Sequence, residues 1–266
     1  MRIIIAGGIY SKDSKFNNAV FCLAKSLSKK SNVKILSISR FPFLSKVPKD
    51  SLKIIKPGKK IIFKLIKNFY SSYKIISDYV NFFSIYGVIV FFRFLINRSN
   101  AEIMIIENKY DIINIHSTDL ERYAFFYVLL KNNLPFVTTV HGLYSLDKNF
   151  NNSYDAEKLE IKLLSEINKR RYPIIFVSSG FKKAALDKFK LDDSNLHVIP
   201  NGVDIKKFNY KNLTEKEEIR KKYGIPLDSK VIIQVGNLYK IKNHITVLEA
   251  ISKMDKKMKN DVLMKK

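Results

Sequence analysis

Two basic side chains follow apolar segments that are predicted to be strands. His141 comes directly after the segment 135–140, and Lys242 comes shortly after the segment 231–235. In parallel sheets, ligands bind beyond the carboxyl ends of the strands, where loops and helix N-termini converge. A lysine at a helix N-terminus suits a phosphate, because its compact charge adds to the helix dipole. The pattern predicts an anion site, with His141 and Lys242 on two sheets that face each other.

Other chemistries lack the residues that they need. Gly7-Gly8 follows the first predicted strand, but the continuation Ile-Tyr-Ser-Lys does not complete the Gly-x-Gly-x-x-Gly pattern of dinucleotide-binding folds. A P-loop pattern is missing too, and Cys22 is the sole cysteine, which excludes an internal disulfide and a cysteine-based zinc site. No two histidines have metal-ligand spacing. His116 also follows a predicted strand, and it either lines the same cleft or lies in a solvated loop.

The elements that must position these residues alternate between short apolar runs and longer amphipathic ones. That alternation is typical of a parallel sheet covered by helices, so we expect an α/β fold with one doubly wound sheet over residues 1–200. The expected strands are 2–6, 33–38, 52–55, 111–115, 135–140, 173–177 and 196–199. The expected helices are 17–30, two or three between 60 and 108, 120–131, 155–170 and 180–189.

The character of the sequence changes after residue 200. Turn residues at 200–204 are followed by a charged helix at 212–222, a buried strand at 231–235 and an amphipathic helix at 244–254. A single strand and helix cannot bury their own apolar faces. We therefore expect residues 201–266 to be the beginning of a second, incomplete domain.

Several segments, in their order and spacing, resemble the GT-B glycosyltransferases of family 4, which are retaining enzymes that use sugar nucleotides. The resemblance runs from residue 1 to the C-terminus. The segments that carry it are Thr-Thr-Val-His-Gly-Leu at 138–143, Val-Ser-Ser at 177–179, Val-Ile-Pro-Asn-Gly-Val-Asp at 198–204, Val-Gly-Asn-Leu-Tyr-Lys-Ile-Lys-Asn-His at 235–244 and Leu-Glu-Ala at 248–250. The resemblance implies an acceptor-side domain at 1–200, followed by the junction and the beginning of a nucleotide-sugar-binding domain at 201–266.

The resemblance also assigns roles to residues. Lys242, with Asn237 and Gly236, would hold the diphosphate of the donor, and His141 would lie at the reacting centre. The leaving phosphate would accept the proton of the acceptor, so neither a cofactor nor a metal ion is implied beyond the nucleotide-sugar donor. The family's glycine pair before the first helix is replaced by Ser14-Lys15, where Lys15 could supply charge. The family's pair of glutamates lies beyond residue 266.

The chain carries 48 basic and 24 acidic residues, a formal net charge of +24. Lysine supplies most of the basic residues, which is explained in part by compositional drift, and the sequence has no nucleic-acid-binding motif, so we expect no nucleic acid partner. Between residues 40 and 100 there are twelve cations against only Asp50 and Asp78. The lysines of this region lead into aromatic residues that include Phe69, Tyr70, Tyr73, Phe82, Phe83, Phe91 and Phe92. Either helices pack these aromatics inward, or the region is a patch that contacts an anionic membrane surface.

Neither a membrane-spanning run nor a signal peptide is predicted, which favours a cytoplasmic protein at the inner face of the membrane. The leading hypothesis is a glycosyltransferase that moves a sugar from a nucleotide-sugar donor to a lipid-linked or envelope glycan. The alternative is a catalytically incomplete glycosyltransferase that retains only the acceptor domain. The donor base, the sugar, the acceptor and the oligomeric state are not encoded in any recognised pattern.

Overall fold

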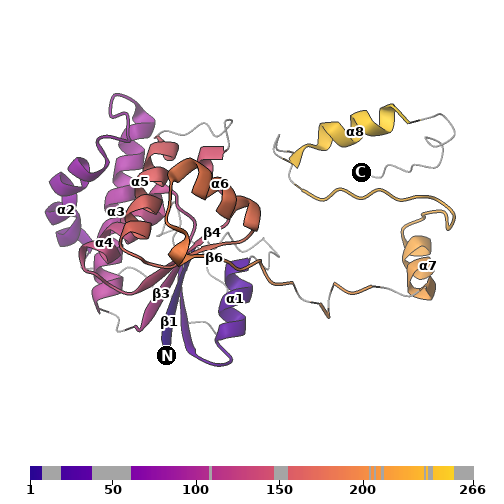
Figure 1. Cartoon of the computed structure of the whole chain (residues 1–266), viewed down its shortest axis with the longest axis horizontal. Coiled ribbons are helices and arrows are strands. Elements are labelled where there is room, and N and C mark those ends of the chain that lie inside the picture. The colour runs from indigo at the N-terminus through magenta and orange to yellow at the C-terminus, as the bar shows by residue number, and fades with distance from the viewer. Residues whose placement is uncertain are drawn as a thin grey trace. The chain divides into compact units, whose positions relative to one another are not determined.

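The computed structural model describes residues 1–7, 19–37, 61–107, 110–146, 155–203, 205–206, 208–210, 213–236, 238 and 242–254 (Figure 1). The chain divides into two compact units, Met1–Gly202 and Val203–Lys266. Each unit is described by itself below.

Unit 1, Met1–Gly202, is built on a parallel sheet. Its described strands are β1 (Arg2–Gly7), β2 (Asn32–Ser37), β3 (Ile112–His116), β4 (Phe136–Val140), β5 (Ile174–Phe176) and β6 (Leu196–Val198), in the order β2-β1-β3-β4-β5-β6. Strands that are buried on both faces read as continuous apolar runs, as Ile3-Ile4-Ile5 does. The segment 52–55, which was predicted to be a strand, lies outside the described residues.

Helices cover both faces of this sheet. They are α1 (Ala19–Leu27), α2 (Ile61–Ile76), α3 (Ile85–Glu107), α4 (Leu120–Lys131), α5 (Ala156–Lys169) and α6 (Ser179–Phe189), with short 3-10 turns η1 (Tyr144–Leu146) and η2 (Asp193–Asn195). Successive residues of a strand point to opposite faces. Ile3 and Ile5 accordingly pack with α1, whereas Ile4 packs with α3 to α6 (Figure 1).

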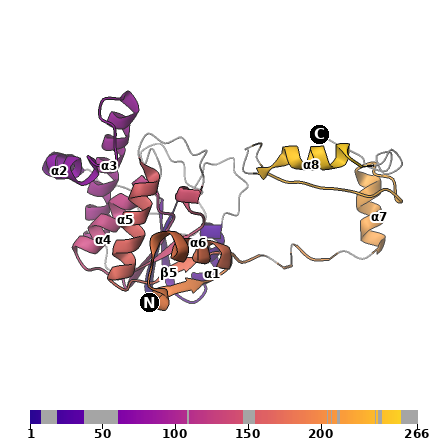
Figure 2. The ribbon, with the colours of Figure 1, turned by 45° about the horizontal axis from the view of Figure 1, so that its top comes forward.

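Two helices account for the long apolar stretch 60–108. Helix α3 packs against α4, and α2 packs on α3 at the outer edge of unit 1, as a second view shows (Figure 2). The predicted strands and helices of unit 1 that fall on described residues are confirmed, with ends within two residues except that α1 ends at Leu27, three residues before the predicted end.

Unit 2, Val203–Lys266, contains α7 (Leu213–Lys222) and α8 (His244–Ser252) among its described residues. The buried strand predicted at 231–235 is wrong, because these residues have no regular secondary structure and are exposed. In the described part of unit 2, no neighbouring strand supplies the hydrogen-bonding partners that a buried strand requires.

Candidate active site

The parallel register of β3 and β4 brings two histidines together at the carboxyl edge of the sheet. His116 ends β3 and lies opposite Thr139, so His141 follows two residues later at the same edge. Nδ1 of His116 and Nε2 of His141 share a hydrogen bond of 2.8 Å, and their rings stack with centroids 5.1 Å apart. His141 follows its strand as the sequence predicts, whereas His116 is the last residue of its strand. His116 is buried beside His141 and does not lie in a solvated loop.

Burial makes this pair neutral. His116 is only 3% exposed, and burial, together with the nearby charges of His141 and Arg122, lowers its pKa from 6.5 to about 3. Burial also lowers the pKa of His141. One neutral ring must therefore donate to the other. The pair uses Nε2 of His141, which leaves Nδ1 of that ring for another partner, whereas Nε2 of His116 is buried without a partner among the described residues.

The loop between β3 and α4 is strained. Ser117 has a φ of 83°, a left-handed conformation that is uncommon for a residue with a side chain. Its hydroxyl contacts the hydroxyl of Tyr144 at 3.2 Å, and the carboxylate of Asp119 caps α4 by accepting from the backbone N–H of Arg122 at 3.0 Å. Asp119 before an apolar helical run is the one signal of this loop that the sequence carries. The Ser117–Tyr144 contact was not predicted.

A buried carboxylate fixes the two loops of the site relative to each other. Glu160 of α5 is fully buried and accepts from the hydroxyl of Thr118 at 2.7 Å and from the backbone N–H of Ser145 at 3.0 Å. Lys188 of α6 donates to the carbonyl of Ser145 at 2.7 Å. The segment that carries His141 is therefore held by two helices, which preorganises the site. Glu160 was missed because the sequence pattern does not distinguish it from an exposed acid of α5.

The N-terminus of α6 lies beside the same loop. Ser178 caps this helix, since its hydroxyl accepts from the backbone N–H of Phe181 at 3.2 Å. A methyl group added at Gly142, next to His141, would lie 4.0 Å from the ring of Phe181. Backbone N–H groups at a helix N-terminus favour anions. The carboxyl edge of unit 1 thus offers two neutral imidazoles next to a helix N-terminus.

The second predicted half of the site lies in unit 2. Lys242 is exposed just before α8, as expected, and its backbone carbonyl accepts from the side chain of Gln234 at 2.8 Å. Gly236 packs against this lysine, because a Cβ there would lie 3.4 Å from Cγ of Lys242. Asn237 and Lys15 lie outside the described residues. That Lys242 and His141 line one cleft stays a prediction, since they belong to separate units.

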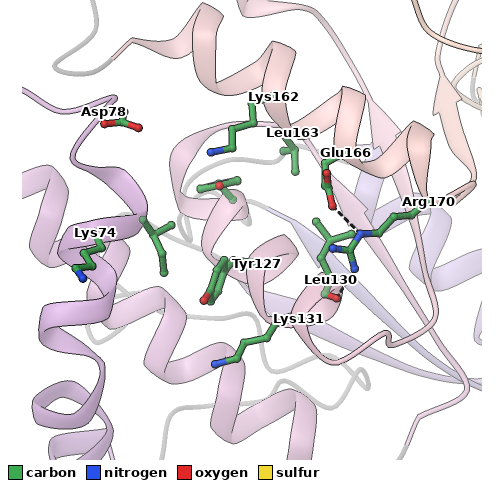
Figure 3. A pocket seen from close by; sticks show the side chains of 11 residues that line it. Lys74, Asp78, Tyr127, Leu130, Lys131, Lys162, Leu163, Glu166 and Arg170 are labelled. Carbon is green, nitrogen blue, oxygen red and sulfur yellow. Dashed lines mark hydrogen bonds and ion pairs between the residues drawn. The ribbon is translucent and has the colours of Figure 1, made fainter.

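A cavity of about 510 Å³ lies elsewhere, between α2, α4 and α5 (Figure 3). Its lining residues are Lys74, Ile75, Asp78, Tyr123, Tyr127, Leu130, Lys131, Lys162, Leu163, Glu166 and Arg170. Arg170 is paired with Glu166 at 2.6 Å and donates to the carbonyl of Leu130 at 2.8 Å (Figure 3). None of the predicted site residues lines this cavity. Across the described ranges, no group of three acidic, histidine or cysteine side chains could hold a metal ion.

Comparisons with known proteins place these observations in context. Residues 74–207 match the model of Glycosyltransferase Family 4. The chain is 29% identical over 144 residues to the putative teichuronic acid biosynthesis glycosyltransferase TuaC of Bacillus subtilis, an alignment that covers 54% of this chain and 35% of the relative. The segment 74–207, which matches the family model, contains both His116 and His141.

Two solved structures share the fold at low identity. A glycosyltransferase from Rickettsia africae matches with a TM-score of 0.57 at 19% identity, over 95% of this chain and 57% of its own. Anabaena Alr3699/HepE, in complex with UDP and glucose, matches with a TM-score of 0.57 at 13% identity, over 98% of this chain and 59% of its own. The chain thus spans a third to three fifths of the length of these relatives.

Proposed function

Because this chain belongs to glycosyltransferase family 4 and has the GT-B type of α/β fold, we propose that it transfers a sugar from a nucleotide-diphosphate donor to a glycan acceptor. The observation that carries the proposal is the buried His116–His141 pair, which lies within the matched segment and at the edge of the sheet where ligands bind. The Anabaena structure holds UDP and glucose, which favours a nucleotide sugar as donor.

In this proposal, His141 lies at the reacting centre and donates from Nδ1 to the donor sugar or its phosphate. This role requires Nδ1 of His116 to donate to Nε2 of His141, so that the hydrogen of the neutral His141 ring is on its Nδ1. Burial supports this arrangement, because it lowers the pKa of both rings and keeps them neutral. His116 is then a positioning residue, because it fixes the tautomer of His141. A donor aimed at the developing charge stabilises the transition state more than the ground state.

The diphosphate is assigned to Lys242, Gly236 and Asn237, which precede α8 in the sequence, with Lys15 as a further cation. A lysine beside a helix N-terminus neutralises the charge that grows on a leaving phosphate. The transfer is retaining, and the leaving phosphate takes the proton of the attacking hydroxyl on the same face of the sugar. This route needs neither a cofactor nor a metal ion.

We assign the acceptor to the lipid-linked or envelope glycans, in surface polysaccharide or lipooligosaccharide biosynthesis at the inner face of the cytoplasmic membrane. The support is the name of the Bacillus relative, which assigns that protein to teichuronic acid biosynthesis, and the formal charge of +24, which suits an anionic surface. Among its described helices, the chain has none that is both long and apolar enough to cross a membrane.

A second candidate is a catalytically incomplete glycosyltransferase that binds its acceptor and does not turn over. The observation in its favour is the exposure of residues 231–235 and of α8, of which every residue is at least partly exposed. These residues lie around Gly236 and Lys242, and a loosely packed neighbourhood is poorly suited to hold a diphosphate in one geometry.

The test is release of nucleoside diphosphate by the purified chain, measured over a panel of nucleotide sugars with a lipid-linked glycan as acceptor. We expect one donor to be turned over, and the His141→Ala variant to lose about a hundredfold in kcat with an unchanged circular dichroism spectrum. His197→Ala is the matched control, because His197 is an exposed residue of β6. Acceptor binding without turnover of any donor would instead establish the second candidate.

A further inference from the structure

Helix α2 has apolar residues on both of its sides. Its buried side is mixed, since Ile61 and Ile76 are buried at its two ends, with Asn68 and Ser72 between them. On the opposite side, Phe63 is 82% exposed and Tyr70, two turns later, is 66% exposed. A surface helix of a globular protein normally turns its apolar stripe toward the core. The outward side of α2 is therefore built to meet something other than water.

Hydrogen bonds to α3 hold α2 in this orientation. Asn68 donates to the hydroxyl of Ser99 at 3.3 Å, and Arg98 donates to the hydroxyls of Ser71 and Ser72, each at 2.9 Å. Arg98 also lies 3.5 Å from the carboxylate of Glu102. Rotating α2 about its own axis would leave these buried polar groups without hydrogen-bond partners. Each lost partner would cost about 1–3 kcal/mol of stability. These hydrogen bonds, together with the buried Ile61 and Ile76, fix which side of α2 faces inward and leave a second apolar side facing outward.

The exposed apolar surface continues onto the beginning of α3. The ring of Phe69 on α2 lies 6.4 Å from that of Phe92 on α3, and the ring of Tyr73 lies 4.9 Å from that of Phe82 in the turn between the helices. We call the outer face the exposed apolar residues Ile62, Phe63, Ile66, Phe69, Tyr70, Tyr73, Phe83, Ile85, Tyr86 and Phe92. It lies at the edge of unit 1 where α2 covers α3 (Figure 2). A contiguous apolar surface of this kind marks an interaction site.

The charges along its border identify the partner. Lys67 and Lys74 are exposed and two turns apart, so they lie on the same side of α2. Lys74 also lines the cavity of Figure 3, where cations of α4 and α5 lie with the acids Asp78 and Glu166. Between residues 61 and 101, the sequence contains a single acidic residue, Asp78. Aromatic and aliphatic side chains bordered by lysines suit the interface of an anionic bilayer.

We infer that the outer face inserts into the headgroup region of a membrane that contains anionic lipid, with α2 lying parallel to the bilayer plane. The apolar side chains enter the boundary between headgroups and acyl chains, and Lys67 and Lys74 contact lipid phosphates. Of the two alternatives that the sequence left open, inward packing holds for Phe91, which is buried, but not for the outer face. The inference does not depend on sugar transfer, because binding needs no turnover.

Cosedimentation of the full chain with vesicles tests it. The chain should bind phosphatidylcholine vesicles that contain phosphatidylglycerol, and bind vesicles of phosphatidylcholine alone more weakly. The triple variant Phe63→Ser, Ile66→Ser, Tyr70→Ser should lose at least about tenfold in affinity, because it removes three large apolar side chains from the contact. The double variant Lys67→Gln, Lys74→Gln should lose the preference for phosphatidylglycerol.

A matched control distinguishes binding through the outer face from nonspecific adsorption through any exposed apolar side chain. Ile233, Val235 and Leu238 in unit 2 are equally exposed, and their triple serine variant should bind vesicles as the unaltered chain does. The inference is overturned if the α2 variant binds vesicles normally or if the unaltered chain stays in the supernatant. A chain that self-associates in sedimentation velocity through the outer face, without binding vesicles, would also overturn it. Circular dichroism establishes that each variant is folded.

Discussion

Two isoleucine-rich segments of similar composition have opposite environments. Ile3-Ile4-Ile5 forms the middle of β1, where Ile5 is fully buried, whereas in Val231-Ile232-Ile233 the side chain of Ile233 is 78% exposed. The first segment lies between β2 and β3 and has helices on both faces. The second has no paired strand among the described residues of unit 2. The comparison teaches that an apolar run becomes a buried strand only where neighbours supply hydrogen bonds and cover.

The largest expected difference is in the free energy of unfolding when one large apolar side chain in each unit is replaced by alanine. Phe126 of α4 is fully buried in unit 1 and packs on Phe136, with ring centroids 5.6 Å apart. Phe126→Ala should lower the free energy of unfolding by about 3–5 kcal/mol, because it removes buried area and leaves a cavity. Ile233→Ala should change it by less than about 0.5 kcal/mol. Urea unfolding followed by circular dichroism measures both.

Similar effects from the two substitutions would break the comparison. A cost of several kcal/mol for Ile233→Ala would mean that this side chain is buried in solution. A small cost for Phe126→Ala would mean that unit 1 collapses around the cavity. The m-value should remain unchanged for Ile233→Ala, since the surface exposed on unfolding stays the same.

The sheet of unit 1 could be predicted because its strands are buried on both faces and therefore read as unbroken apolar runs. The orientation of α2 could not be predicted, because the segment 61–76 has apolar residues on two sides, and tertiary contacts such as the pairing of Asn68 with Ser99 decide which side is buried. The failed strand at 231–235 has a related cause, since the pattern reports what a segment would bury and not whether neighbours exist.

Only part of the candidate site could be predicted from the sequence. Both histidines could be singled out because they follow predicted strands, but their contact depends on the register that sets His116 opposite Thr139. Glu160 and Ser117 act through tertiary contacts that no local pattern encodes. The roles of Lys242, Gly236, Asn237 and Lys15 stay predictions.

An intermediate effect is expected from acid, and it should come from unit 1. The pKa of His116 is about 3 in the folded chain against 6.5 for an unperturbed histidine. As the pH falls below about 6.5, the unfolded chain binds a proton that the folded chain does not. The stabilising contribution is therefore complete above about pH 6.5 and is lost progressively down to about pH 3. Between pH 7.5 and pH 5, the loss should be about 2 kcal/mol.

Urea midpoints measured across this range test the assignment. The lowered pKa of His141 acts in the same direction, so it adds to the loss. His116→Asn keeps a polar side chain next to His141 but cannot take up a proton, so its stability should fall less steeply between pH 6.5 and pH 5. An equally steep fall in this variant would assign the acid sensitivity to groups other than His116.

The smallest expected effect contrasts the helix caps of the two units. Ser178 caps α6 with its hydroxyl, so Ser178→Ala should cost about 1 kcal/mol. Asn243 precedes α8 with a left-handed φ of 54° and makes no side-chain cap bond within the described residues. Asn243→Gly removes only the exposed hydrogen bond that the hydroxyl of Thr246 donates to Oδ1 of Asn243 at 2.7 Å. It should therefore change stability by at most a few tenths of a kcal/mol, because glycine tolerates that conformation and no bond to a backbone N–H is lost. Alanine would be a poor choice here, since its Cβ is strained at positive φ. Urea midpoints at a constant m-value measure both substitutions, and an equal cost for the two would show that α8 is held as firmly as α6.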